Sequence, residues 1–568
     1  MRAARRLVLA ALACAVVPAA YAATVTGTNG PDLLRGTPGN DAIFGRGGDD
    51  VVDGLAGDDF LGVGPGRDTA VGGPGNDRLA LHADGARDTA RCGGGIDVVN
   101  AELTDLVAKD CEVVSRQLSR DPYTDLESQH ETQVEPDSFA AGSTVVTTFQ
   151  SGRHVNGGAE NIGFATSRDG GTRWRSGFLP SLSAASSPPG PSERVSDPVV
   201  AYDALHRTWL IASLGVSTDR TSLQVSRSPD GLRWSRPVPA ANDPEEDYDK
   251  EWITCDNGAR SRFRGHCYLS YLDVASRQLR TRSSSDGGLF WSEPVSASVE
   301  AEANAIVNGA QPVVRPDGSL LVLFSVFGAV SERGDNYIGA VRSGDGGATF
   351  APSVRVAALE EEPIPGMRSP ALPSVEVDGG GRIFVAWHDC RFRDSCLAND
   401  IVLASSRDGV TWSGPRRVPV AAGGPEVDHF VPGLGVDSST SGRRTRIAIA
   451  YHTLRPASGC FGLCGPGVDV SLIRSGDGGV TWSRPQRLSA ESMQLAWIAD
   501  TGIGRMLADY ISTSFVRGRP VPVFAVAAPL VGDEFRQAIF ATTTLKAGEP
   551  MVPPPAPSFR SRRAGAAR

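Results

Sequence analysis

The segment Ser167-Arg168-Asp169-Gly170-Gly171-Thr172-Arg173-Trp174 is the first of six similar segments in the chain. Each copy has a serine, an aspartate two residues later, one or two glycines and then an aromatic residue; the copies start at Ser167, Ser228, Ser284, Ser343, Ser406 and Ser475. Asp-Gly between strand-like runs predicts a tight turn, because glycine accepts positive φ and aspartate caps free backbone amides. A repeat of about sixty residues therefore predicts a series of similar units built from short strands.

Pairs of apolar runs lie between these turns and predict the inner strands of each unit. Their starts number seven, near Glu135, Asp197, Trp252, Gln311, Pro373, Phe430 and Arg505. Regular short strands at a fixed repeat indicate a β-propeller, whose ring must close. We therefore expect a strand near Glu112 to Gln117 to complete the last blade beside the run Ala538 to Thr544. Six turns suggest six blades, whereas seven strand pairs suggest seven, and both alternatives stay open.

The S-x-D-G-(G)-x-T-W pattern resembles the Asp-box, or BNR repeat, of sialidase-like β-propellers. The resemblance implies an all-β fold, with a six- or seven-bladed propeller over residues 134–545. It also implies that the repeated turns lie at the periphery of the blades, so they report the fold and are not expected to be catalytic.

A second repeat, with a period of nine residues, precedes the propeller. Glycine stands two residues before each of the first six aspartates and an apolar residue or alanine two residues after it; these are Asp32, Asp41, Asp50, Asp59, Asp68 and Asp77, and Asp88 and Asp97 follow with a slip of two. The pattern resembles the RTX, or haemolysin-type, calcium-binding β-roll. It implies a small parallel β-roll over residues 24–100 that binds Ca²⁺ through these aspartates and backbone carbonyls. An acidic glycine-rich linker is the alternative, but a linker has no reason to keep a register. We expect calcium removal to unfold residues 24–100 and to leave the propeller folded.

The first 22 residues have a basic start, an apolar run and the small residues of a cleavage site, which predicts a signal peptide and a secreted, extracellular protein. Beyond it, eight cysteines remain, an even number suited to disulfides. Neighbours along the chain give the expected pairs Cys92–Cys111, Cys255–Cys267, Cys390–Cys396 and Cys460–Cys464. Zinc is the competing interpretation, but no pair has C-x-x-C spacing.

Composition limits the remaining possibilities for this chain of 568 residues. Its formal net charge is −9, with 65 acidic and 56 basic residues, which argues against nucleic acid as a partner. No segment after the signal has the 18 or more apolar residues that a membrane helix needs. We expect a connector at 101–133, a disordered Pro- and Arg-rich tail at 546–568, and a monomer.

Candidate site residues follow from the loops that join inner strands, where propellers usually bind ligands. Sialidases bind a substrate carboxylate with three arginines, and use a tyrosine nucleophile, an assisting glutamate and an aspartate as acid and base. The resemblance suggests Arg153, Arg368, Arg391 and Tyr451 for substrate binding, and Asp249, Glu251, Asp389 and Tyr510 for catalysis, with Tyr451 as the alternative nucleophile.

The motifs of the family do not carry over completely. The Arg-Ile-Pro triplet is absent, Gln311 replaces an expected glutamate, and Ser325-Val326-Phe327 lacks an expected arginine. Structural interpretations are also open: a hydrogen-bond network or a second calcium site at Asp247 to Glu251, an ion pair at His388 to Arg391, and a packed side chain at Tyr510.

The sequence therefore predicts a secreted, calcium-binding, sialidase-like propeller that acts on an extracellular glycan or glycoprotein, with exo-α-sialidase-type glycoside hydrolysis as the enzyme activity. The alternative is a non-catalytic propeller that binds glycan or protein, with the β-roll as a calcium-dependent folding or export module. A lyase, or a glycosidase for uncharged sugars, is a third option that would need no arginine triad.

Overall fold

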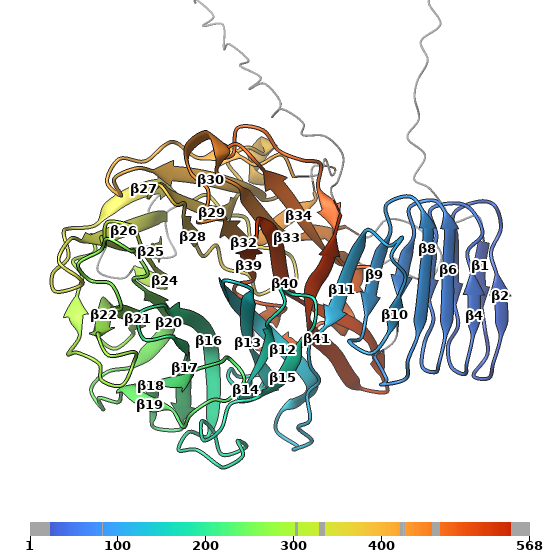
Figure 1. Ribbon diagram of the computed structural model, residues 1–568, viewed down its shortest axis with the longest axis horizontal. Coiled ribbons are helices and arrows are strands. Elements are labelled where there is room, and N and C mark those ends of the chain that lie inside the picture. Colours follow the sequence, from blue (N-terminus) through green and yellow to red (C-terminus); the bar gives the residue numbers. More distant parts are fainter. Residues whose placement is uncertain are drawn as a thin grey trace, which may run out of the picture.

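A computed structural model describes residues 23–81, 83–300, 305–328, 336–420, 424, 426–456 and 466–546. It shows a ring of antiparallel β-sheets joined at one side to a flat stack of parallel strands (Figure 1). The expected signal peptide, the tail beyond Lys546 and the pair Cys460–Cys464 lie outside the described residues. Within the described ranges, no helix is long and apolar enough to cross a membrane.

The N-terminal part is a parallel β-solenoid with two sheets. One sheet contains β1 (Ala23–Thr26), β3 (Asp41–Phe44), β5 (Phe60–Gly62), β7 (Arg78–Ala80), β9 (Val98–Ala101) and β11 (Val113–Gln117). The other contains β2 (Leu33–Arg35), β4 (Val51–Asp53), β6 (Thr69–Pro74), β8 (Thr89–Gly94) and β10 (Leu106–Val107). Ala42 pairs with Phe60, so two nine-residue repeats make one turn. Ile43, Val52 and Leu61 are fully buried between the sheets, which explains the apolar residue in each repeat.

Six four-stranded antiparallel units follow along the ring. Units one to three are β12 (Gln129–Ala141), β13 (Thr144–Arg153), β14 (Ala159–Ser167) and β15 (Arg175–Phe178); β16 (Arg194–Asp203), β17 (Thr208–Ser217), β18 (Arg220–Ser228) and β19 (Val238–Ala241); and β20 (Tyr248–Cys255), β21 (Cys267–Asp273), β22 (Gln278–Ser284) and β23 (Val295–Ser296). Units four to six are β24 (Ile306–Val314), β25 (Leu320–Phe327), β26 (Tyr337–Ser343) and β27 (Val354–Ala358); β28 (Ser374–Val377), β29 (Ile383–Asp389), β30 (Asp400–Ser406) and β31 (Arg416–Arg417); and β32 (Asp428–Val436), β33 (Ile447–Arg455), β34 (Gly467–Ser475) and β35 (Gln486–Arg487).

Shorter elements lie in the connections of the ring. They are η1 (Asp394–Cys396), η2 (Gly442–Arg444), β36 (Met493–Gln494), η3 (Leu495–Trp497), β37 (Asp500–Thr501) and β38 (Gly504–Arg505). β36 pairs with β34, and β37 pairs with β38.

The last unit of the ring, which we call the closing unit, is completed by a strand from the solenoid. β39 (Ser512–Val516), β40 (Arg519–Val531) and β41 (Glu534–Leu545) form an antiparallel sheet, and β11 pairs with β41. The expected pairing of residues 112–117 with the last strand is confirmed. β11 also pairs in parallel with β9, so one strand belongs to both parts of the molecule. The segment 101–133, expected as a connector, therefore holds β10, β11 and the start of β12.

The repeated Ser-x-Asp-Gly turns join the third and fourth strands of the six complete units. In the first turn, Asp169 Oδ1 accepts hydrogen bonds from the backbone amides of Thr172 (3.1 Å) and Arg173 (2.9 Å) and from Ser167 Oγ (2.9 Å). The other five aspartates make corresponding contacts. Hydrogen bonds from Thr349 lower the pKa of Asp345 to about 2. Each aspartate therefore caps its own turn, as the sequence predicts.

Three of the expected disulfides are present within the described residues: Cys92–Cys111, Cys255–Cys267 and Cys390–Cys396. The first ties β8 to the segment just before β11, and the second closes the hairpin between β20 and β21. Each bridge therefore fastens a local loop.

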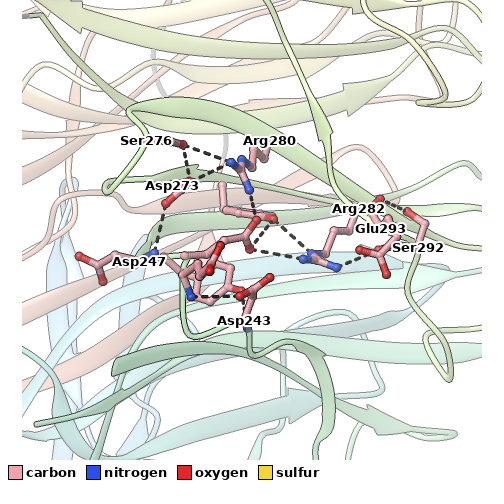
Figure 2. Close-up of polar contacts among 12 residues, drawn as sticks. Asp243, Asp247, Asp273, Ser276, Arg280, Arg282, Ser292 and Glu293 are labelled. Atoms are coloured by element: carbon pink, nitrogen blue, oxygen red, sulfur yellow. Dashed lines mark hydrogen bonds and ion pairs between the residues drawn. The ribbon is translucent and has the colours of Figure 1, made fainter. Parts of the chain in front are cut away.

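A buried charge network stabilises the third unit (Figure 2). Glu246 accepts hydrogen bonds from Arg280, from Arg282 (3.3 Å) and from the Tyr271 hydroxyl (3.3 Å). Arg280 also forms an ion pair with Asp273 at 3.1 Å. Here each charge is matched by opposite charges within one unit, which is the pattern of a structural network.

Candidate active site

Five of the innermost strands share one irregularity, a bulge at which the strand pairing shifts. One residue of each bulge has positive φ: Glu135 (52°), Asp197 (50°), Lys250 (49°), Gly309 (69°) and Val431 (46°). Positive φ is costly for residues other than glycine and persists where the surroundings require it, often at functional sites. In the first three units the strained residue is charged, so the same backbone distortion aims three charged side chains at one place.

These three side chains converge on a fourth from the closing unit. Lys250 Nζ lies 3.2 Å from Glu135 Oε1, 3.2 Å from Asp197 Oδ2 and 2.7 Å from Asp509 Oδ2. Asp509 precedes β39 and also pairs with Arg368 Nη2 at 2.8 Å. Lys250 is one of only three lysines in the sequence, and its side chain is 9% exposed. The cluster ties units one, two and three to the closing unit.

The cluster forms part of the wall of a pocket of about 640 Å³. Its charged lining consists of three arginines and a lysine (Arg153, Arg194, Arg368 and Lys250) and five carboxyl groups (Glu135, Asp197, Asp249, Glu361 and Asp509). The pocket is large enough for a small ligand and carries both signs of charge in its wall. It is therefore the candidate active site, and we call it the wide pocket.

Two of the arginines expected from the sequence, Arg153 and Arg368, line this pocket. Arg153 is buried, and its Nη1 donates to the carbonyl oxygens of His154 (2.8 Å) and Asp500 (3.3 Å). The third arginine in the wall is Arg194, which sequence analysis missed. The sequence feature that could have indicated Arg194 is its position three residues before Asp197, at the start of β16.

Arg391, expected as the third arginine, is instead paired with Asp389. Its Nε and Nη2 lie 2.7 and 2.6 Å from the two carboxylate oxygens of Asp389, and Trp387 Nε1 donates to the same carboxylate at 3.0 Å. Neither Asp389 nor Arg391 belongs to the lining of the wide pocket. The structure therefore shows Asp389 and Arg391, expected for catalysis and substrate binding, as an ion pair with each other outside this pocket.

The acidic groups of the pocket differ in how their surroundings affect their pKa. Burial raises the pKa of Glu135 to about 7, although Lys250 opposes the shift. Burial and the charge of Asp197 raise the pKa of Asp249 to about 6. Asp509 is buried too, but Lys250 and Arg368 hold its pKa below the ordinary value. Near neutral pH, one wall of the pocket thus holds protonatable carboxyl groups beside Asp509, whose ionised form is favoured.

Tyr510 and Tyr451 are packed side chains. The Tyr510 hydroxyl donates to the Pro198 carbonyl at 3.2 Å, and burial raises its pKa well above the ordinary value. Its ring lies 5.0 Å from that of Trp252, centroid to centroid. Tyr451 is fully buried in unit six, against His429. Neither tyrosine lines the wide pocket, which argues against the expected role of either as nucleophile or substrate contact there.

Glu251, expected to be catalytic, also lies outside the lining of the wide pocket. It faces a second, smaller cavity that adjoins the first at Lys250 and Asp509. Of the four residues expected to be catalytic, Asp249 is the one that the wide pocket contains.

The aspartates of the solenoid form ladders from turn to turn. Asp41 N donates to Asp59 Oδ1 at 2.8 Å, Asp50 N to Asp68 Oδ1 at 2.7 Å, and Asp59 N to Asp77 Oδ1 at 2.9 Å. The second oxygen, Oδ2, is buried and has no hydrogen-bond partner in Asp50, Asp59, Asp68, Asp77, Asp88 and Asp97. Burial raises the pKa of several of these groups, to about 7 for Asp68 and Asp77. A row of buried, unpartnered carboxylate oxygens beside backbone carbonyls fits calcium, a hard cation with oxygen ligands.

Asp32 and Asp41 differ from the later aspartates in the ladder. Their Oδ2 atoms accept hydrogen bonds from the backbone amides of Thr28 (2.6 Å) and Thr37 (2.5 Å). The first repeats therefore fit an ion less closely than the repeats from Asp50 onward.

Comparisons with known proteins agree with this description of the solenoid. The RTX calcium-binding nonapeptide repeat family matches residues 26–61 and 63–99. These repeats bind calcium, so Ca²⁺ is the cofactor of the solenoid.

Several solved structures are similar in fold at low sequence identity. A protein of unknown function from Dyadobacter fermentans is 14% identical over 63% of this chain and 98% of that chain, with a TM-score of 0.41. An ulvan lyase is 12% identical over 76% of this chain and 96% of that chain, with a TM-score of 0.44. A Hadza microbial sialidase is 14% identical over 76% of this chain and 93% of that chain, with a TM-score of 0.37. Carbohydrate-active enzymes are thus among the proteins to which the chain is similar.

Proposed function

We propose that this protein is a secreted, calcium-binding β-propeller of seven blades that hydrolyses an extracellular glycan carrying a carboxylate group. The seventh blade is the sheet of β39, β40, β41 and β11. The reaction takes place in the wide pocket, and Asp249 is the proton donor. The observation that carries the proposal is the pairing, in one pocket wall, of a protonatable Asp249 with an ionised Asp509.

Glycoside hydrolysis requires two carboxyl groups with different protonation states. One gives a proton to the leaving oxygen, and the other, as a carboxylate, stabilises the positive charge that develops at the anomeric carbon or activates a nucleophile. Asp249, with a pKa of about 6, suits the first role. Asp509, kept ionised by Lys250 and Arg368, suits the second. Environments that separate two pKa values in this way are typical of acid and base assignments.

The preference for an acidic sugar is supported by three arginines in the pocket wall. Guanidinium groups bind carboxylates with two parallel hydrogen bonds, and Arg153, Arg194 and Arg368 enter the wall from different units. Sialosides and uronosides are therefore the substrates to test first. The Ser-x-Asp-Gly turns support the assignment of the ring to the Asp-box propellers.

A second candidate function is glycan or protein binding without catalysis. The observation that favours it is the extent of pairing in the cluster, because Lys250 contacts three carboxylates and Arg368 is shared with one of them. A closed ionic network can hold a ring together without taking part in chemistry.

The test is a panel of fluorogenic glycosides that includes sialosides, uronosides and neutral sugars, measured in calcium. We expect turnover of an acidic glycoside and its loss in Asp249→Asn. Asp219→Asn serves as the matched control, because Asp219 is an exposed carboxylate outside the pocket. Binding of an acidic glycan without turnover would support the second candidate, and turnover restricted to neutral glycosides would contradict the proposed role of the arginines.

A further inference from the structure

A second cavity, of about 100 Å³, adjoins the wide pocket at Lys250 and Asp509. Four acidic side chains line it. Asp509 is shared with the wide pocket, and the other three each come from the innermost strand of a different unit: Asp137 in β12, Glu251 in β20 and Glu376 in β28. The hydroxyl-bearing side chains of Ser138 and Ser512 are also in its wall. A water molecule occupies about 30 Å³ in the liquid, so a cavity of this size has room for more than one small guest.

Glu251 is the unusual member of this group. The residue is 1% exposed, and neither carboxylate oxygen has a hydrogen-bond partner among the described residues. Leaving a buried carboxylate unpaired is costly, so such a group normally meets a donor, a cation or a proton. Burial raises the pKa of Glu251 well above its ordinary value, so the carboxyl group stays protonated unless a cation binds beside it.

The protein itself supplies little positive charge to this cavity. Lys250 is the basic residue of its lining, and its ammonium group is already in contact with Glu135, Asp197 and Asp509. Burial and the charge of Asp137 raise the pKa of Glu376 to about 8. Asp137 accepts a hydrogen bond from Val200 N at 2.8 Å, so its carboxyl group is fixed in place by the backbone. The cavity therefore has more carboxyl groups than the available cation can neutralise.

We propose that this cavity is a metal site, separate from the solenoid, that binds one hard divalent cation such as Ca²⁺, with Glu251 as its direct carboxylate ligand. Carboxylate and hydroxyl oxygens are the donors that such an ion prefers, and water molecules complete its coordination. Asp137 and Glu376 act on the ion through those waters. The bound ion links units one, three and five across the axis of the ring. The site does not depend on the hydrolytic activity proposed above.

Terbium luminescence tests the site in the full-length protein. Tb³⁺ replaces Ca²⁺ at oxygen-rich sites and emits when a nearby tryptophan is excited. Trp252 lines the same cavity, whereas residues 23–107 of the solenoid contain no tryptophan. We expect tryptophan-sensitised emission that Ca²⁺ displaces and that both Glu251→Gln and Trp252→Phe remove. Glu376→Gln, which acts through water, should weaken Tb³⁺ binding about tenfold.

Two control variants make the result specific. Glu245→Gln changes an exposed carboxylate close to the same strand, and Asp249→Asn changes one that lines the wide pocket; both should keep the emission. Loss of the signal in Asp249→Asn but not in Glu251→Gln would place the ion in the wide pocket and overturn the proposal. Absence of sensitised emission in the wild type would overturn it too. Near-UV circular dichroism checks folding; should Glu251→Gln fail to fold, the comparison of Glu376→Gln with Glu245→Gln decides.

Discussion

Lys250 Nζ lies 2.7 Å from Asp509 Oδ2, and this ion pair joins the third unit of the ring to the last. Both side chains are buried, and Lys250 is in a strained backbone conformation with φ of 49°. Breaking a buried ion pair by removing one partner leaves the other charge without compensation. The pair is therefore a point at which stability and function can be tested together.

Replacing Lys250 by methionine should destabilise the ring strongly. Three carboxylates would lose their common cation, and the expected loss in the free energy of unfolding is about 3–5 kcal/mol. Denaturant unfolding followed by tryptophan fluorescence measures the effect. Lys109→Met removes an exposed lysine and should change stability by less than about 0.5 kcal/mol. Equal stability of the two variants would show that the cluster does not hold the ring together.

The pH dependence of kcat/KM should report the ionisation of Asp249. Its raised pKa, about 6, means that the group is protonated below this pH and loses its proton above it. A proton donor must carry its proton, so kcat/KM should fall as the pH rises through about 6, while Asp509 stays ionised throughout. An acidic glycoside is the substrate for this profile. A rate that keeps increasing to alkaline pH would instead indicate that Asp249 acts as a base.

Tyr510→Phe separates a packed tyrosine from a nucleophile. The hydroxyl group donates to Pro198 O and does not line the wide pocket, so its removal should leave turnover within a few fold of the wild type. The lost hydrogen bond should cost about 1 kcal/mol of stability. Turnover and thermal unfolding are measured on the same preparation. A folded variant without activity would restore Tyr510 as the candidate nucleophile.

Calcium removal should destabilise the ring as well as the solenoid, contrary to the expectation from sequence of a selective effect on residues 24–100. β11 pairs with β9 of the solenoid and with β41 of the closing unit. Asn100 extends the contact, because its side chain bonds the backbone of Leu488 (3.3 Å) and Ala490 (2.7 Å). Loss of order in the solenoid therefore loosens the outer strand of the last unit.

Tryptophan fluorescence during heating reports on this coupling, because residues 23–107 contain no tryptophan. We expect the ring to melt at a lower temperature in EDTA. In the presence of calcium, Asp68→Asn should lower the melting temperature of the ring by a smaller amount. This substitution alters the solenoid alone. An unchanged tryptophan transition in EDTA, with separate loss of solenoid structure, would show that the two parts unfold independently.

The sequence by itself determined the repeating elements of this protein, because they depend on local chemistry. Asp169 and its five counterparts cap their own turns, and the period of nine from Asp32 to Asp77 sets the register of the solenoid, since each turn needs the same glycine, aspartate and apolar residue. Disulfides between cysteines that are close along the chain could be predicted for the same reason, because they too depend on local chemistry.

Only the tertiary structure decided which loop residues meet. Glu135, Asp197, Lys250 and Asp509 are up to several hundred residues apart, and their convergence depends on bulges and on the curvature of the ring, which no local pattern encodes. The tertiary structure likewise placed Arg194, and not Arg391, in the wall of the wide pocket, and it placed Tyr510 and Glu251 in the wall of the adjoining smaller cavity. It also made β11 common to both parts of the molecule, because a sheet edge accepts whichever strand long-range packing brings to it.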